Sequence, residues 1–415
     1  MSRWQWLWRR LTRRLWFRAA LFTLLAVATA LVASVAEPFI PYKITVSIGA
    51  KAVDNILGIL ASSMLAVTTF SLTAMVSAYS AVTNNTTPRA TRLVIEDRTA
   101  QNAIATFLGS FLFSVAGIVA LSTGIYGENG RVILFVVTIL VIAWIVVTLL
   151  RWIERLSGLG RVEETVMRVQ EATRQALRQW VDRPHLGARP SVPQPEAAHQ
   201  VFPEERGYLQ HVDLGRLSEL GEEMGQAVHL LALPGTYLHP HRAMLWLESP
   251  CEEDVAKHLR AAFTLGSNRS YDQDPRFGMI VLSEIASRAL SPAVNDPGTA
   301  IGVLTAGGQL LAEWAEGQAR VRPEGPLPHV HAPSLSAEDL FDDFFQPIAR
   351  DGAAMLEVGI RLQKTLQMLA PLGGFRFTAR RHSQAALEHA EKALGMASER
   401  RILRELALTE PQTAA

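Results

Sequence analysis

Four long apolar stretches follow one another within the first 150 residues of the 415-residue chain. They lie at about residues 19–36, 56–82, 103–125 and 132–150. A helix needs roughly 20 apolar residues, at about 1.5 Å each, to cross the hydrocarbon core of a bilayer. A soluble core does not explain four such stretches in a row. The sequence therefore predicts an α-helical membrane protein with a four-helix transmembrane domain over residues 19–150.

The first stretch has a second interpretation. A basic segment, an apolar run and small residues before Glu37 also make up a secretory signal peptide. The run is longer than the roughly 7–15 residues of a signal core, which favours an uncleaved helix.

Basic residues are distributed unevenly over the loops. Arginines gather in residues 1–18, in the loop after the second stretch and at the exit of the fourth, whereas the other loops hold only Lys43, Lys51 and Arg131. Tryptophans alternate with the arginines of residues 1–18, as interfacial anchors do. Because basic loops stay inside, we expect a multi-pass protein of the cytoplasmic (inner) membrane with both termini cytoplasmic. The net charge of +1 gives no reason to expect a nucleic-acid partner.

The second stretch carries a line of polar residues. At 100° per residue they fall in one narrow stripe about 45 Å long. The stripe consists of Asn55, Ser62, Thr69, Thr73, Ser77, Ser80 and Asn84. It either packs against other helices, where small hydroxyl residues are common, or lines a water-filled pathway. No charged residue or histidine lies within the four stretches, which argues against a proton relay but not against a passive pore.

The stripe ends at a break in the helix. Pro88 disfavours helical geometry at Thr87, and Arg89 and Arg92 follow at the expected cytoplasmic mouth. In an oligomer these arginines would form a ring that favours anions; alternatively, they only contact lipid phosphates. Small residues in the third stretch predict close helix packing, within or between subunits. They are Ala105, Gly109, Ser110, Ser114 and Gly117.

Residues 151–415 have the composition of a soluble α+β and helical domain. Residues 151–206 predict an amphipathic connecting helix, whose apolar seam from Val162 to Trp180 either joins subunits or docks on its own domain, and a Pro-rich linker. Residues 207–270 predict a small subdomain with a split β-α-β-β-α-β sheet. Residues 271–415 predict a helical subdomain interrupted by a Pro-rich loop at residues 317–335.

A polar cluster surrounds the first two helices of the helical subdomain. It consists of Arg269, Asp272, Asp274, Arg276, Asn295 and Asp296. If their loops meet, these residues could hold a phosphate, a cation or a nucleotide. Helix capping and internal salt bridges explain the same residue types.

Motifs for catalysis are missing from the sequence. It has no phosphate-binding glycine loop, no nucleophile elbow and no zinc-protease motif. His239 and His241 with His229, and His329 with His331, are better explained by a proline turn and a loop than by a metal site. A single cysteine, Cys251, makes neither an internal disulfide nor a cysteine metal cluster. No catalytic residue, metal or cofactor is predicted.

Several segments together resemble a known family. They are Pro88-Arg89, Asp97, Gln101, Thr106–Phe111, Gly207–Gln210, Asp274–Gly278 and Arg288–Ala300. The Ser-Pro, Asn-Asp-Pro and Thr-Ala run within Arg288–Ala300 is the most specific. The chain resembles the bacterial predicted membrane proteins of domain of unknown function 2254. The resemblance implies an integral membrane protein with a cytosolic domain, and it implies no activity.

The sequence as a whole favours a homo-oligomeric channel or pore with a Ser/Thr-lined second helix and a cytoplasmic domain for assembly or gating. Its partners would be the bilayer, further copies of the chain, and a small ion or anionic ligand. A membrane-anchored sensor or scaffold is the alternative, and a membrane-tethered enzyme is a third, less favoured hypothesis. A pore needs the stripe to face water, whereas a sensor needs a ligand at the polar cluster.

Overall fold

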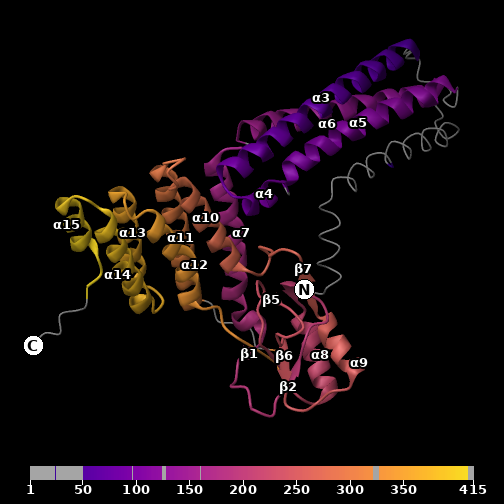
Figure 1. The fold of residues 1–415 in the computed structure, drawn as a ribbon. Coiled ribbons are helices and arrows are strands. Elements are labelled where there is room, and N and C mark those ends of the chain that lie inside the picture. The colour runs from indigo at the N-terminus through magenta and orange to yellow at the C-terminus, as the bar shows by residue number, and fades with distance from the viewer. Residues whose placement is uncertain are drawn as a thin grey trace, which may run out of the picture. The chain divides into compact units, whose positions relative to one another are not determined.

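The computed structural model describes residues 50–95, 97–123, 128–158, 160–320 and 327–409, together with Leu24. The chain divides into two compact units. Among the described residues, the apolar unit comprises residues 50–82 and 92–161, and the polar unit comprises Thr83–Thr91 and residues 162–409. Figure 1 labels the elements of both. The predicted segments 1–18 and 19–36 lie outside the described residues, apart from Leu24.

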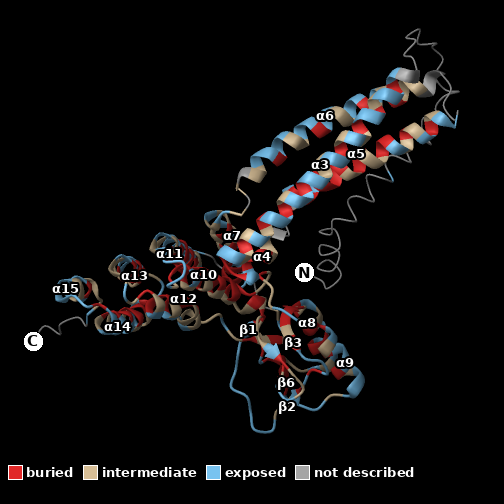
Figure 2. Cartoon of the chain, turned by 45° about the horizontal axis from the view of Figure 1, so that its top comes forward, coloured by how far each residue is buried: buried red, intermediate tan, exposed pale blue. Residues whose placement is uncertain are grey.

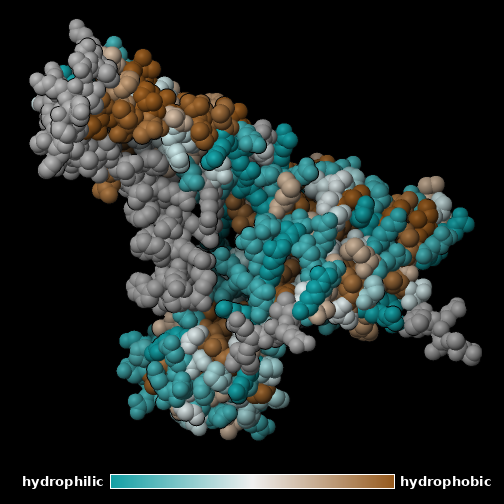
Figure 3. All heavy atoms as spheres, turned by 180° about the vertical axis from the view of Figure 1, so that it is seen from behind, coloured by the Kyte–Doolittle hydropathy of each residue, from teal (hydrophilic) through white to brown (hydrophobic). Residues whose placement is uncertain are grey.

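Long helices make up the described part of the apolar unit. They are α3 (Ala50–Asn85), α5 (Arg98–Ser122) and α6 (Glu128–Gly158), with the short α4 (Pro88–Ile95) between α3 and α5. The three long helices are each long and apolar enough to cross a membrane. Their outer faces carry exposed apolar side chains such as Leu72, Leu140 and Trp144. Figure 3 shows apolar side chains gathered over the described helices of the apolar unit, whereas the surface of the polar unit is mostly hydrophilic. Three of the four predicted membrane helices are thus present in the part of the chain that the structure describes.

Helix α3 packs through a regular seam. Its buried residues recur at spacings of three, four and seven, and five of them, from Val53 to Met75, meet residues of α5 and α6 in two apolar clusters. The seam consists of Val53, Leu57, Leu60, Met64, Ser71, Met75, Ala78 and Val82. Gly117 of α5 lies so close to this seam that a Cβ there would be 3.0 Å from Cδ1 of Leu57. The small residues predicted for packing in the third stretch are all buried, so they pack within the chain.

The start of α5 is fixed by Asp97. Its carboxylate accepts a hydrogen bond from the Thr99 amide at 2.8 Å and pairs with Arg155 of α6 at 2.7 Å. An aspartate at this position satisfies a free amide of the first turn, and the ion pair joins the two helices. Pro88 starts α4, where its missing N–H and fixed φ suit the first helical position.

The α+β part of the polar unit contains two sheets. Its elements in chain order are β1 (Arg189–Pro190), β2 (His199–Val201), β3 (Gly207–Val212), α8 (Leu214–Met224), β4 (Val228–Leu230), β5 (Tyr237–Leu238), β6 (Leu245–Leu247), α9 (Glu253–Ala261), β7 (Phe263–Gly266) and β8 (Val330–Ala332). One sheet has the order β1-β8-β4-β6-β2, and the other has the order β5-β3-β7. The predicted single split sheet is therefore wrong.

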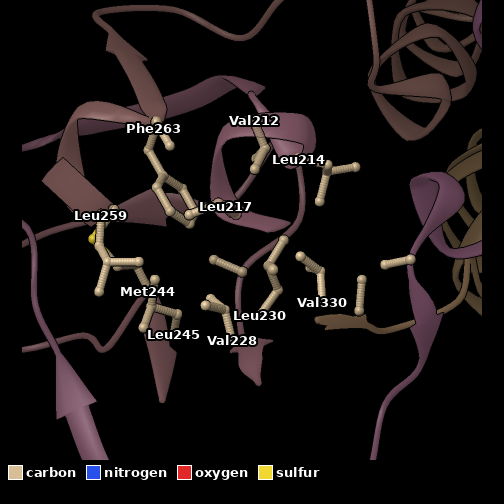
Figure 4. Packing of buried hydrophobic residues seen from close by; sticks show 14 of the residues in the cluster. Val212, Leu214, Leu217, Val228, Leu230, Met244, Leu245, Leu259, Phe263 and Val330 are labelled. Carbon is tan, nitrogen blue, oxygen red and sulfur yellow. The ribbon is translucent and has the colours of Figure 1, made fainter. Parts of the chain in front are cut away.

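Local chemistry explains this difference. Helix α8 ends at Met224 because the next residue, Gly225, adopts a left-handed conformation with φ of 65°, and β4 begins at Val228. Strands β1, β2 and β8 are two or three residues long and lie in the segments predicted as a Pro-rich linker and loop. Side chains of both sheets and of α8 and α9 share one apolar core, including Val212, Leu217, Leu230, Leu245 and Phe263 (Figure 4).

Helices complete the polar unit. They are α7 (Val162–Asp182), the short 3-10 turn η2 (Pro184–Gly187), α10 (Pro275–Ala289), α11 (Pro297–Arg320), α12 (Ala337–Asp351), α13 (Leu356–Leu369), α14 (Arg376–Ala393) and α15 (Ala397–Leu406). Helix α7 packs against α10 and α11 of the same chain. Gly278 of α10 makes this approach possible, because a Cβ there would overlap the buried side chain of Thr173. The amphipathic seam of α7 thus docks on its own domain.

Candidate functional site

The polar stripe of α3 lies on the helix face that the described chain leaves uncovered. All seven residues, from Asn55 to Asn84, are exposed. At 100° per residue the stripe is centred about 180° around the helix from the buried seam. Figure 2 shows buried and exposed positions alternating along α3. Packing against α5 and α6 therefore does not account for the stripe.

Hydroxyl groups of the stripe also bond within their own helix. Ser62 donates to the Gly58 carbonyl oxygen, Thr69 to that of Leu65 and Thr73 to that of Thr69, each at 3.0 Å. Such bonds satisfy the hydroxyl proton and leave the oxygen available as an acceptor. These residues can therefore face either water or lipid without an unpaired donor.

The predicted cytoplasmic mouth is held by an acidic residue that sequence reasoning missed. Glu284 of α10 forms an ion pair with the Arg89 guanidinium and accepts a hydrogen bond from Thr87 Oγ1 at 3.0 Å. The Tyr271 hydroxyl donates to the Arg89 carbonyl oxygen at 3.3 Å. The other predicted mouth residue, Arg92, is half-buried. Glu284 is the one acidic residue among the helical positions of α10, and that isolation is the signal that marks it in the sequence.

The buried half of the predicted polar cluster is an ion pair. Nε and Nη2 of Arg269 donate to the two carboxylate oxygens of Asp274 at 2.7 and 2.9 Å. The side chain of Asp274 is 3% exposed and accepts from the Phe277 amide at 3.1 Å, which caps α10. Burial raises the pKa of Asp274, and Arg269 and the amide oppose this shift. Both residues are thus engaged by the protein itself.

Arg276 and Asp272 of the predicted cluster have side-chain partners outside the Arg269–Asp274 ion pair. Arg276 pairs with Asp339 at 2.6 Å and with Asp343 at 2.7 Å, which ties α10 to α12. Asp272 accepts from the Ser270 hydroxyl at 3.0 Å.

Asn295 and Asp296 lie at the opposite end of α10 from Asp274. The 15 residues of α10 separate the two groups by about 22 Å. Asn295 has a φ of 50°, and Asp296 caps α11 by accepting from the Thr299 amide at 3.0 Å and from its hydroxyl at 2.6 Å. The Thr299 hydroxyl lowers the pKa of Asp296. The structure therefore does not bring the six predicted cluster residues together.

The histidines that the sequence singled out are arranged differently from a metal site. The rings of His239 and His241 are 6.1 Å apart, whereas His229 stacks between Trp246 and His331. Within the described ranges, no group of three or more His, Cys, Asp or Glu side chains is placed to hold a metal ion.

Comparison with known proteins identifies a family of unknown activity. The model of the predicted membrane protein family DUF2254 matches residues 12–368. Uncharacterized proteins of Mycobacterium bovis and Mycobacterium tuberculosis are each 31% identical over 157 residues, which are 36% of this chain and 28% of each relative. The match thus spans little more than a quarter of those relatives. No solved structure matches. The chain belongs to the DUF2254 family of predicted membrane proteins, as its sequence motifs predicted.

Proposed function

We propose that this membrane protein is a homo-oligomeric pore in which α3 lines the conducting pathway. The observation that carries the proposal is the complete exposure of the seven-residue stripe on the face opposite the packing seam. The stripe extends about 44 Å from Asn55 to Asn84, which exceeds the roughly 30 Å hydrocarbon core. A polar line through the whole thickness of the bilayer is suited to a water-filled path between several copies of the chain.

The stripe also has apolar neighbours on both sides. Phe70 and Leu72 are exposed and lie about 100° from the centre of the buried seam in opposite directions. An α3 that contributes only its narrow polar face to a central pathway leaves these flanks for contacts with lipid or with neighbouring copies.

The proposed gate is the contact between α10 and the segment Thr83–Thr91. This segment holds the last residues of α3 and belongs to the polar unit. Because the backbone is continuous, a shift of Glu284 would act on α3 through Thr87 and Arg89. We also propose that both termini lie in the cytoplasm and that the protein lies in the inner membrane, because basic residues gather in the loops expected to stay inside.

Cysteine accessibility tests whether the stripe meets water. Cys251 is the one cysteine of the chain, so Cys251→Ser gives a cysteine-free background. Single cysteines at Ser62, Thr69 or Thr73 should react in proteoliposomes with a charged methanethiosulfonate reagent. Matched cysteines at Phe70 and Leu72 should remain unmodified. Equal protection of both sets would show that the stripe faces lipid or protein and would refute the pore.

Planar-bilayer recordings test conduction itself. We expect discrete currents from the wild-type protein that Thr73→Leu and Ser77→Leu reduce. Thr148→Leu on α6 is the matched control, because its hydroxyl also bonds within its own helix, to Trp144. Absence of current from folded, oligomeric protein would favour the alternative of a membrane-anchored sensor.

A further inference from the structure

The hydroxyl groups of the α3 stripe present oxygen lone pairs to whatever lies on that face. Ser62, Thr69 and Thr73 are exposed, and each hydroxyl oxygen lies 3.0 Å from the carbonyl oxygen one turn earlier in the helix. A carbonyl group only accepts, so the hydroxyl is the donor in each pair. The lone pairs of the hydroxyl oxygen stay available. At these positions the face therefore offers acceptors, and the hydroxyl protons are already used.

A line of acceptors distinguishes cations from anions. Oxygen lone pairs replace the water around an alkali cation, whereas an anion needs N–H or O–H donors. Thr69 and Thr73 lie one helical turn apart, so several copies of α3 around a common axis would form two rings of hydroxyl oxygens about 6 Å apart. The amides of Asn55 and Asn84, at the two ends of the stripe, carry donors and acceptors alike and favour neither sign.

Fixed charges along α3 do not oppose this preference. The charged residues of the helix are Lys51 and Asp54, which have opposite signs and lie near its start. From Asn55 to Asn85 the helix has no charged residue. Its last turn also holds no basic residue, so the free carbonyl groups there keep their partial negative charge. The dipoles of the hydroxyl groups and of the helix end thus decide which ion is favoured.

The arginine at the predicted cytoplasmic mouth is neutralised. Arg89 forms an ion pair with Glu284, whose second carboxylate oxygen accepts from Thr87 Oγ1 at 3.0 Å. The side chain of Arg89 is 55% exposed and that of Glu284 is 32% exposed, so an ion at this point meets both charges. The sequence alone suggested a ring of arginines that favours anions, and the ion pair cancels the charge that Arg89 would bring to such a ring.

We propose that the pore selects monovalent cations over chloride. The hydroxyl oxygens of Ser62, Thr69 and Thr73 make the selection, and Glu284 keeps Arg89 from reversing it. This inference rests on the proposed pore and names the class of ion that passes through it. The stripe holds no carboxylate, the usual ligand of Ca²⁺ and Mg²⁺ in proteins, which is why the class is monovalent.

Reversal potentials measure the selection directly. The purified full-length protein is recorded in planar bilayers with a higher KCl concentration on one side than on the other. We expect the sign of a potassium current and a K⁺-to-Cl⁻ permeability ratio of at least about five, which corresponds to a difference of about 1 kcal/mol. A reversal potential near zero, or one of the sign for chloride, would overturn cation selection.

Removing hydroxyl groups tests which atoms select. Thr69→Val combined with Thr73→Val deletes two hydroxyl groups and keeps the branched shape, so the width of the pathway is retained. The permeability ratio should fall toward one. Thr148→Val on α6 is the matched control, because its hydroxyl also donates within its own helix, to the Trp144 carbonyl oxygen at 2.8 Å, and it should leave the ratio unchanged. A ratio that survives the loss of both stripe hydroxyls would refute their role.

Charge changes test the part assigned to Glu284. Glu284→Gln leaves the charge of Arg89 unbalanced and should lower the permeability ratio, and adding Arg89→Gln should restore it. Failure of the second change to restore the ratio would show that Glu284 acts through the fold and not through charge. Absence of any current from the wild-type protein would refute the pore itself, whereas a chloride-selective current would refute only this inference.

Discussion

Replacing Asp274 with alanine should destabilise the polar unit strongly. The change removes both hydrogen bonds to Arg269, at 2.7 and 2.9 Å, and the cap on the Phe277 amide. The guanidinium of Arg269, with its side chain 19% exposed, would then lack its carboxylate. Breaking a buried pair by removing one partner costs about 3–5 kcal/mol, and losing a helix cap costs about 1 kcal/mol. Because Arg269 keeps some contact with water, we expect a total of about 3 kcal/mol.

Thermal unfolding of the full-length protein in detergent measures this effect. For a unit of this size, about 3 kcal/mol corresponds to a decrease in Tm of about 6–12 °C. Asp254→Ala, at an exposed position in the first turn of α9, is the matched control and should change stability by less than about 0.5 kcal/mol. A decrease for Asp274→Ala no larger than that of the control would refute a structural role. Asp274 would then be held in place for a ligand instead.

Three further predictions concern the same unit. Glu284→Ala removes the partner of the Thr83–Thr91 segment, so hydrogen exchange there should become faster while exchange in α13 is unchanged. Gly278→Ala should lower stability by about 1–3 kcal/mol through overlap with Thr173, and Thr173→Ala should restore part of the loss in a double-mutant cycle of melting temperatures. Burial, with a smaller contribution from His331, lowers the pKa of His229 from 6.5 to about 4. The unfolded chain therefore takes up a proton first, and stability should fall as the pH drops from 6.5 to 4; His229→Phe should remove up to about 3 kcal/mol of this dependence in urea titrations at several pH values.

Hydropathy predicts the apolar helices well because the bilayer imposes one simple requirement. Three predicted stretches coincide with α3, α5 and α6, although each helix extends beyond its apolar part at one or both ends. The ends of the helices lie in more polar sequence, where caps, kinks or prolines decide the last helical residue. Asp97, which caps the start of α5, is one such signal. Hydropathy does not register these signals.

The sheets were predicted less well because tertiary contacts create them. Strands β1 and β8 pair in parallel although 139 residues separate the end of one from the start of the other in the chain. Each is two or three residues long, too short for a periodic pattern, and each follows or precedes prolines. Only the apolar core beneath them, which includes Val330 and Ala332, determines where they pair.

Individual caps in the polar cluster could be predicted, but the distance between them in the fold could not. Asp274 and Asp296 cap α10 and α11, as their positions before the prolines of two helices suggest. The length of α10 keeps them apart, and Arg276 pairs with aspartates of α12 that lie more than 60 residues away in the chain. Long-range pairing of this kind leaves no local signal in a single sequence.

The buried seam of α3 limits what the polar stripe on its opposite face can contact. The sequence alone allowed the stripe to pack or to face water, because hydroxyl residues serve both purposes. The buried apolar residues of α3 occupy the opposite face, and those from Val53 to Met75 pack with residues of α5 and α6. Those two helices are therefore unavailable to cover the stripe. Any partner for it must be another segment, another copy of the chain, lipid or water, and only water would let a charged reagent reach a cysteine at Thr69 while sparing one at Phe70.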